Sequence, residues 1–336
     1  MTYRRTEAKE TGGRMTDSHS AGSDRSERPH SPGRIRARTV TICAFAVMLV
    51  AGLVLAAACG GPSGGGSDRD AQRGDSSARP EPKPEPTRIW DRSPDSLAAV
   101  GDSITRGFDA CSVLADCTEV SWATGTEGDV NSLARRLLDD PQGKSWNYAV
   151  SGAVIGDLPQ QMRKAAAAGP DMVTVMSGAN DACRPTVEQM TPVEEFRTSF
   201  REALRVLRAE QPKTQVYVSS VPDLKRLWQQ GKGNPIGERV WSLGICQSML
   251  KDPRATDQAA QDRRQAVHDR VVAYNSVLKQ ECADDLRCRY DNGAVFRYRF
   301  TGKELSNWDW FHPSKAGQRS LAELAHRQIV APRPAG

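Results

Sequence analysis

The residue whose setting first suggests chemistry is Ser103, in the stretch Gly101-Asp102-Ser103. An apolar run precedes this stretch, so the serine would stand where a buried strand ends. One interpretation is an ordinary strand-to-helix turn, because glycine permits tight geometry and Asp or Ser can cap a helix. The other is a nucleophile held at the C-terminal edge of a sheet. The stretch alone leaves both open, because glycine and serine turns are common.

A serine nucleophile needs a base, normally histidine, and a group that orients the base. Only three histidines follow residue 38, and two of them, His268 and His326, fall within helical patterns where a solvated face explains them. His312 instead lies in a loop before a helix, with Asp309 three residues earlier. Such a loop can fold back so that the carboxylate accepts the imidazole N–H and the other nitrogen faces outward. A helix-capping role is the alternative.

Attack on an ester carbonyl also needs hydrogen-bond donors aimed at the developing negative charge. Gly152 in "NYAVSGA" and Asn180 in "VMSGAND" each follow an apolar run. Gly152 would offer an unobstructed backbone N–H, and Asn180 a side-chain amide. Either residue could simply form a turn. Chance does not readily place all four features in this order, each at a strand end or in a loop before a helix.

The elements that must position these residues alternate along the chain. Short β-branched apolar runs predict buried strands at residues 96–100, 146–150, 171–176, 215–221 and 293–296. Helical patterns cover residues 130–140, 193–211 and 256–285, and a last one follows Pro313. This alternation predicts an α/β fold with a mostly parallel sheet covered on both faces, and active sites collect beyond the C-terminal ends of such strands.

Residues 222–255 interrupt the alternation with Gly, Pro and two tryptophans. We interpret them as a long excursion tied down through Cys246. The excursion either walls a substrate cleft or decorates the surface, and the sequence leaves both open.

The 336 residues divide by composition. Residues 1–38 and 60–89 contain few large apolar side chains and are predicted to be disordered, the second as a Gly/Ser/Pro-rich linker. Residues 90–336 have the size of one α/β domain. Four of the five net positive charges lie within residues 1–38, so the folded part has no bulk charge to attract nucleic acid. A G-x-S-x-G match at Ser63 lies in the linker with no strand before it, which excludes that serine as the nucleophile.

Residues 39–59 carry no charge and are long enough to cross a bilayer. Arginines precede the segment and no charge follows it before Asp68, which predicts a cytoplasmic N-terminus and an exported domain. The segment ends in "LAAAC" at Cys59, which resembles the lipobox of bacterial lipoproteins, although Ala56 stands where those proteins usually have Leu. A lipidated Cys59 and an uncleaved anchor both remain open. Either would tether the domain to the membrane.

Export makes the six cysteines of the folded part candidates for disulfides. Two pairs, Cys111 with Cys117 and Cys282 with Cys288, share a spacing of six residues, which leaves Cys183 to pair with Cys246. A metal site is the rival interpretation, but no Cys-x-x-Cys is present and no histidine lies close to these cysteines. We therefore predict three disulfides and neither a metal nor a cofactor.

Taken together, the stretches around Ser103, Gly152, Asn180 and His312 resemble the four blocks of the SGNH hydrolases, also called GDSL esterases and lipases. The resemblance spans residues 97 to about 325, with Ile104 where many members have Leu. It implies a three-layer α/β/α sandwich of the flavodoxin-like kind. It also implies a Ser103 nucleophile, a His312 base oriented by Asp309, and an oxyanion hole from the Ser103 and Gly152 N–H groups and the Asn180 amide.

The paired cysteines and the stretch "VSWATGT" look most like exported actinobacterial lipases and the phospholipase B branch of this family. We therefore expect a monomeric, extracellular, membrane-tethered serine ester hydrolase that forms an acyl-enzyme on Ser103. Its substrate would be a lipid, phospholipid or acylated glycan ester. A phospholipase, a carbohydrate or cell-wall O-acyl esterase, and an acyltransferase are alternatives within enzymes. A catalytically silent surface-binding module is the alternative of another class.

Overall fold

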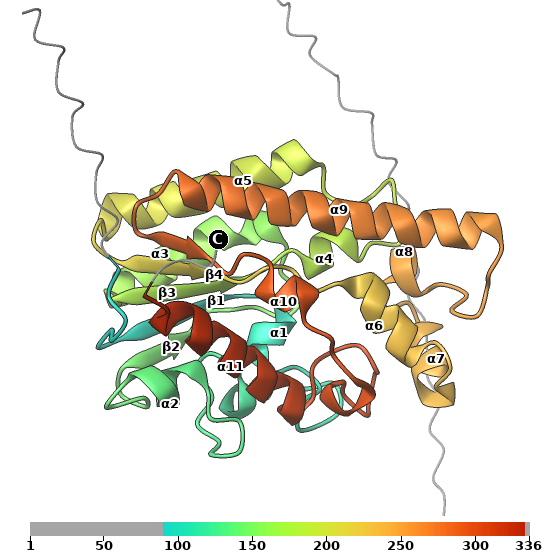
Figure 1. Cartoon of the computed structure of the whole chain (residues 1–336), viewed down its shortest axis with the longest axis horizontal. Helices are drawn as coiled ribbons and strands as arrows, with labels where there is room; N and C mark the ends of the chain where they lie inside the picture. Colours follow the sequence, from blue (N-terminus) through green and yellow to red (C-terminus); the bar gives the residue numbers. More distant parts are fainter. Residues whose placement is uncertain (1–89, 333–336) are drawn as a thin grey trace, which may run out of the picture. The chain divides into compact units, whose positions relative to one another are not determined.

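A computed structural model describes residues 90–332 (Figure 1). The predictions for residues 1–38, 39–59 and 60–89, including Cys59 and Ser63, therefore lie outside the described residues. Between residues 90 and 332, none of the helices combines the length and the apolar character that crossing a bilayer requires.

Five parallel strands form one sheet in the order β2-β1-β3-β4-β5. They are β1 (Leu97–Gly101), β2 (Ser145–Asn147), β3 (Met172–Met176), β4 (Gln215–Val218) and β5 (Cys288–Tyr290). The chain runs from β1 to one neighbour and then crosses to the other, so the direction of winding reverses between β1 and β3. Ligands of open parallel sheets bind at such a reversal, beyond the carboxyl ends of the strands.

Helices cover both faces of the sheet. Figure 1 shows α3 (Leu158–Ala168), α5 (Val193–Glu210) and α9 (Gln258–Ala283) on one face, with α2 (Leu133–Leu137) and α11 (Lys315–Val330) on the other. In α5 the buried side chains recur at helical spacing and include Phe196, Phe200, Ala203, Leu204 and Leu207. An apolar stripe of this kind packs a helix onto a sheet. The predicted three-layer α/β/α fold is confirmed.

Short elements occupy the connections. Beyond β1, β3 and β5 lie α1 (Ser103–Arg106), α4 (Ala179–Ala182) and α10 (Ala294–Arg297), and the 3₁₀ turns are η1 (Thr118–Val120), η2 (Ile155–Asp157) and η3 (Gly302–Glu304). The excursion at residues 222–255 forms three helices, α6 (Leu224–Gly231), α7 (Pro235–Trp241) and α8 (Gln247–Leu250).

The strand predicted at residues 293–296 is wrong, because these residues belong to α10 and the fifth strand lies earlier, at β5. The Asp291 carboxylate accepts hydrogen bonds from the N–H groups of Gly293 and Val295, at 2.8 and 3.0 Å. Gly293 has a φ of +77°, which turns the chain into a helical turn directly after the strand. A local carboxylate cap therefore overrides the apolar β-branched character of the run.

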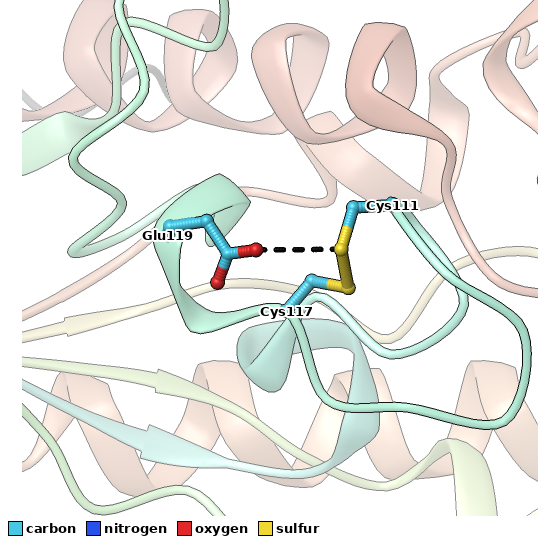
Figure 2. A group of neighbouring side chains, drawn as sticks. All are labelled: Cys111, Cys117 and Glu119. Atoms are coloured by element: carbon cyan, nitrogen blue, oxygen red, sulfur yellow. Dashed lines mark hydrogen bonds between the residues drawn. A yellow bond between two sulfur atoms is a disulfide. The ribbon is translucent and has the colours of Figure 1, made fainter.

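The three disulfides have the predicted pairing: Cys111–Cys117, Cys183–Cys246 and Cys282–Cys288. The middle one joins the end of α4 to the start of α8, which ties the excursion to the segment after β3. In Figure 2 a carboxylate oxygen of Glu119 lies 3.3 Å from Cys111 Sγ. A disulfide sulfur carries no hydrogen, so this approach is a contact and not a hydrogen bond.

Candidate active site

Ser103 is the first residue of α1, directly beyond β1. Asp102 caps this helix by accepting a hydrogen bond of 3.0 Å from the Ile104 N–H. Gly101 lies against the backbone of β3, where an added Cβ would approach the Met176 carbonyl oxygen to 2.1 Å. Only glycine allows this approach, and the tight turn that follows places the serine at the sheet edge. The two interpretations of the stretch are therefore compatible, because a capped turn presents the serine.

His312 and Asp309 complete a hydrogen-bonded chain with this serine. The distance from Ser103 Oγ to His312 Nε2 is 2.9 Å, and the distance from His312 Nδ1 to Asp309 Oδ2 is 2.5 Å. The other carboxylate oxygen, Asp309 Oδ1, accepts hydrogen bonds from the N–H groups of Phe311 and His312. The loop thus folds back on itself as an Asp-x-x-His arrangement can. These are the contacts that a serine, a base and an orienting carboxylate need.

The charges around His312 favour its protonated form. Burial lowers the pKa of the His312 imidazole, whereas the hydrogen bond and the charge of Asp309 raise it. The carboxyl groups of Asp109 and Asp102 act in the same direction, so the pKa of His312 lies above its ordinary value. Burial also opposes ionisation of Asp309, yet the hydrogen bonds from His312 and Phe311 and the charge of His312 together outweigh it and hold the pKa of Asp309 below its usual value.

Gly152 and Asn180 reach the same sheet edge from the segments after β2 and β3. Gly152 is exposed and has a φ of +82°, a conformation that favours glycine. Asn180 lies in α4, and its side-chain amide donates a hydrogen bond of 2.9 Å to the Ala153 carbonyl. The amide has a second N–H. Together with Ser103 and His312, both residues line one open depression, so the structure brings the predicted donors to the serine.

Two cavities meet at Ser103. One is small, with room for about 30 Å³ of water-sized groups, and its walls beyond the reactive residues are apolar. These walls include Pro222, Leu224 and Leu227 of the excursion and Phe300 and Leu305 of the segment before His312. The other is the open depression beside Gly152, of about 370 Å³. The nucleophile thus stands between a confined apolar space and an open one.

The other two histidines of residues 90–332 do not line these cavities. His268 on α9 pairs with Asp223 at 3.2 Å, and His326 lies on α11, where burial and then the charge of Arg136 lower its pKa. Neither lines the cavities at Ser103. Among the described histidines, His312 is therefore the one placed to act on the serine.

The structure also shows what the excursion does, which the sequence left open. Its α6 lines the small cavity, and its α7 supports the loop that carries Asp309 and His312. The buried Trp241 indole N–H donates a hydrogen bond of 2.9 Å to the Asp309 carbonyl. A second residue missed by sequence reasoning is Asp109, a buried acid whose carboxyl group lies next to that of Asp309. No motif or periodic pattern indicated either contact, because each joins distant segments.

Comparison with known proteins gives a family match and several similar solved structures. Residues 97–325 match the family described as GDSL-like lipase/acylhydrolase. No curated protein sequence matches the chain. An acetyl xylan esterase from Geobacillus stearothermophilus is 19% identical, with a TM-score of 0.43, and the match covers 74% of this chain and 100% of that one.

An extracellular lipase from Streptomyces rimosus is 18% identical, with a TM-score of 0.42, over 70% of this chain and 99% of that one. An alpha/beta hydrolase from the metagenome of Lake Arreo, Spain, is 19% identical, with a TM-score of 0.44, over 73% and 100% of the two chains. The family match spans more than half of the sequence and contains all four blocks around Ser103, Gly152, Asn180 and His312. This chain therefore belongs to the family of GDSL-like lipases and acylhydrolases.

Proposed function

We propose that this ester hydrolase works through an acyl-enzyme on Ser103. Ser103 Oγ attacks the ester carbonyl carbon and passes its proton to His312 Nε2. The negative charge on the carbonyl oxygen is held by the N–H groups of Ser103 and Gly152 and by the Asn180 amide. His312 then gives the proton to the departing alcohol, and water activated by the same imidazole releases the acid. The observation that carries this proposal is the hydrogen-bonded chain from Ser103 through His312 to Asp309.

The decisive variant is Ser103→Ala, which keeps the turn and removes the nucleophile. We expect hydrolysis of a chromogenic acetate ester to fall by about a thousand-fold or more while the circular dichroism spectrum is unchanged. Ser276→Ala, at an exposed serine on α9 that lines neither cavity at Ser103, is the control and should keep most activity. Full turnover by the folded Ser103→Ala protein would refute the assignment. If the wild-type protein hydrolyses none of the esters tested, the result would instead favour a catalytically silent surface-binding module.

The two cavities at Ser103 support a short acyl group joined to a larger alcohol. A space of about 30 Å³ holds roughly two or three water-sized groups, which suits an acyl chain of a few carbons. The open depression has more than ten times this volume and opens to solvent, which suits a larger alcohol. We therefore propose that the acyl group enters the apolar cavity and that the alcohol lies in the depression.

Leu227 in the wall of the small cavity provides the test of acyl length. For p-nitrophenyl esters of graded length, wild-type kcat/KM should fall from acetate or butyrate to octanoate. Leu227→Ala enlarges the cavity and should raise the ratio of kcat/KM for octanoate to kcat/KM for acetate by roughly ten-fold or more. Ile245→Ala, which opens the depression instead, should leave the ratio unchanged. If the wild-type protein prefers octanoate, the proposal of a short acyl group is refuted. The proposal of an acyl-enzyme on Ser103 is not affected by that result.

We also propose that the domain is exported and tethered to the membrane through residues 39–59. The uncharged segment supports this, and so do three disulfides, which persist in oxidising compartments. Protease added to intact cells should digest the domain, and lysis should not be required. Labelling with a radioactive fatty acid separates the two anchors: the label should be lost in Cys59→Ala if Cys59 is lipidated. A cytoplasmic, protease-resistant domain would refute export.

A further inference from the structure

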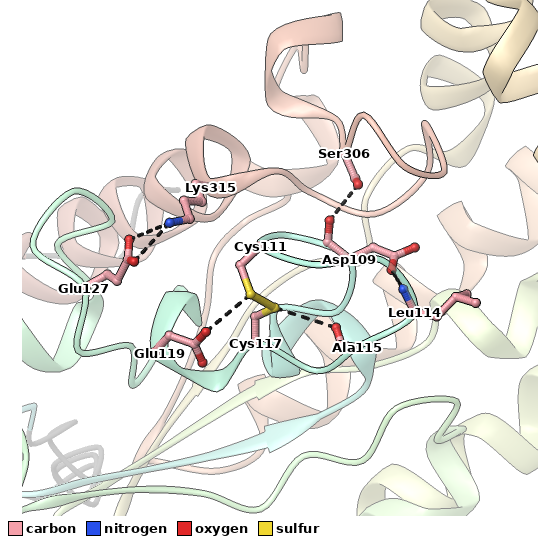
Figure 3. Close-up of a disulfide and its surroundings, with 9 residues drawn as sticks. All are labelled: Asp109, Cys111, Leu114, Ala115, Cys117, Glu119, Glu127, Ser306 and Lys315. Carbon is pink, nitrogen blue, oxygen red and sulfur yellow. Dashed lines mark hydrogen bonds and ion pairs between the residues drawn. A yellow bond between two sulfur atoms is a disulfide. The ribbon is translucent and has the colours of Figure 1, made fainter. Parts of the chain in front are cut away.

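Asp109 is a buried acid on the loop that follows α1, close to the candidate catalytic residues. Its backbone has a φ of +56°, in the left-handed region that Asp tolerates better than most residues but seldom adopts without a reason. Figure 3 shows how the loop holds it. Its N–H donates to the Ala115 carbonyl at 3.0 Å, and its own carbonyl accepts a hydrogen bond of 2.6 Å from Ser306 Oγ.

These backbone contacts aim the Asp109 side chain at the loop that carries the base. Its Oδ1 atom accepts a hydrogen bond from the Leu114 N–H, and its carboxyl group lies beside that of Asp309. One carboxylate oxygen of Asp109, one of Asp309 and a ring nitrogen of His312 all lie within 4.8 Å of one another. The chain of contacts from Ser103 thus continues past Asp309 to a second carboxyl group.

Two carboxyl oxygens can share a hydrogen bond only when one of them carries a proton. Asp309 is the ionised partner, because it accepts hydrogen bonds from His312 Nδ1 and from two backbone N–H groups. The proton therefore belongs to Asp109, whose Oδ1 is occupied by Leu114. Its Oδ2 remains as the atom that can donate to Asp309.

We propose that Asp109 is a positioning residue for His312, acting through Asp309. Protonated, Asp109 donates a hydrogen bond that holds the Asp309 carboxylate against the imidazole. Ionised, it places a second negative charge beside His312 and delays the loss of the imidazole proton. Asp109 thus sets the pH at which the base becomes able to accept the Ser103 proton. This inference rests on the proposed acyl-enzyme function.

The electrostatics give the direction of the effect. Burial, followed by the charge and the hydrogen bond of Asp309, raises the pKa of Asp109 to about 6. Asp109 is therefore neutral below this pH and ionised above it, and its negative charge adds to those that raise the pKa of His312. The other titratable group that faces His312 is Asp102 beyond β1, whose pKa burial raises to about 7. An Asp109 variant still contains Asp102 and Asp309. A difference between its His312 titration and that of the wild type is therefore caused by the change at Asp109.

The sharpest variant is Asp109→Asn. The amide can keep both contacts, because its oxygen accepts from the Leu114 N–H and its N–H donates to Asp309, but it cannot ionise. The rise of kcat/KM with pH should move to lower pH by about one unit, the size of shift that a nearby charge produces. Asp109→Ala removes the same charge and should move the rise in the same direction, while at a pH well above the pKa of Asp109, where the wild-type carboxylate no longer donates, its kcat should stay within a few-fold of the wild type. The control is Asp129→Asn, which makes the same charge change at an exposed position. Its dependence of kcat/KM on pH should match that of the wild type.

A direct titration keeps the test independent of turnover. Histidine labelled with ¹³C in the full-length protein would be followed by NMR in a Ser103→Ala background, with the His312 signal assigned by its absence in His312→Ala. The pKa of His312 should fall on adding Asp109→Asn. An unmoved His312 titration and an unmoved pH profile would show that Asp109 only shapes the loop. If instead the His312 titration moves but the protein with Ser103 intact hydrolyses no ester, the proposed function fails. The effect of Asp109 on the pKa of His312 would then still stand.

Discussion

The indole N–H of Trp241 donates a hydrogen bond of 2.9 Å to the backbone carbonyl of Asp309, across 68 residues of sequence. Trp241 is fully buried at the end of α7. The excursion therefore holds the loop of the orienting carboxylate, as well as one wall of the small cavity. A segment that interrupts the α/β alternation is thereby part of the site.

Loss of this contact should reduce turnover more than binding. In Trp241→Phe the Asp309 carbonyl loses its buried donor, and the loop gains freedom around the His312 base. We expect kcat to fall by about ten-fold, with KM nearly unchanged. Trp228→Phe is a matched control, because its indole N–H donates at 2.9 Å to the Pro253 carbonyl within the same excursion. Equal losses in both variants would show that Trp241 contributes only to the stability of the excursion.

The activity should depend on the ionisation of His312. The neutral imidazole accepts the Ser103 proton, so kcat/KM should rise with pH, and the raised pKa of His312 places the rise above pH 6.5. Asp309→Asn removes the main charge that raises this pKa. The rise should therefore move to lower pH while the maximal rate falls, by less than in His312→Ala because backbone contacts still hold the loop. His268→Ala should leave the profile intact. If it abolishes the ionisation instead, the base is misassigned.

Asn180 should act only where negative charge develops on the substrate oxygen. Asn180→Ala is expected to lower kcat by roughly a hundred-fold with little change in KM. Part of the loss would come from the lost hydrogen bond to the Ala153 carbonyl, which steadies the residue next to Gly152. Steady-state kinetics with the preferred ester separates the two constants. A rise in KM alone would make Asn180 a substrate-binding residue.

The disulfides should differ in their effect on stability. Cys183–Cys246 closes a loop of 63 residues, so replacing both cysteines by Ser should lower the free energy of unfolding by about 4 kcal/mol in the chain-entropy model. Removing Cys282–Cys288, which spans six residues, should cost about 2 kcal/mol in that model. Chemical unfolding monitored by fluorescence gives both values. Because Cys246 lines the depression at Ser103, the first variant should also lose activity.

Much of this protein could be predicted from local sequence. The turn at Ser103, the spacing of Asp309 and His312, and the positions of Gly152 and Asn180 after apolar runs depend on neighbouring residues. Parallel strands then bring their carboxyl ends to one edge, which is why residues 209 positions apart, Ser103 and His312, meet. The cysteine spacing similarly predicted the pairing that the structure contains.

The tertiary structure alone decided three things. It moved the fifth strand from residues 293–296 to Cys288–Tyr290, because the Asp291 carboxylate caps a turn that the apolar run does not reveal. It placed Trp241 on the Asp309 carbonyl and Asp109 beside the Asp309 carboxylate. Contacts of this kind leave no periodic pattern in the sequence, since they depend on how separate loops pack together. The carboxyl group of Asp109 near His312 and the hydrogen bond from Trp241 to the Asp309 loop therefore become apparent only in the folded chain.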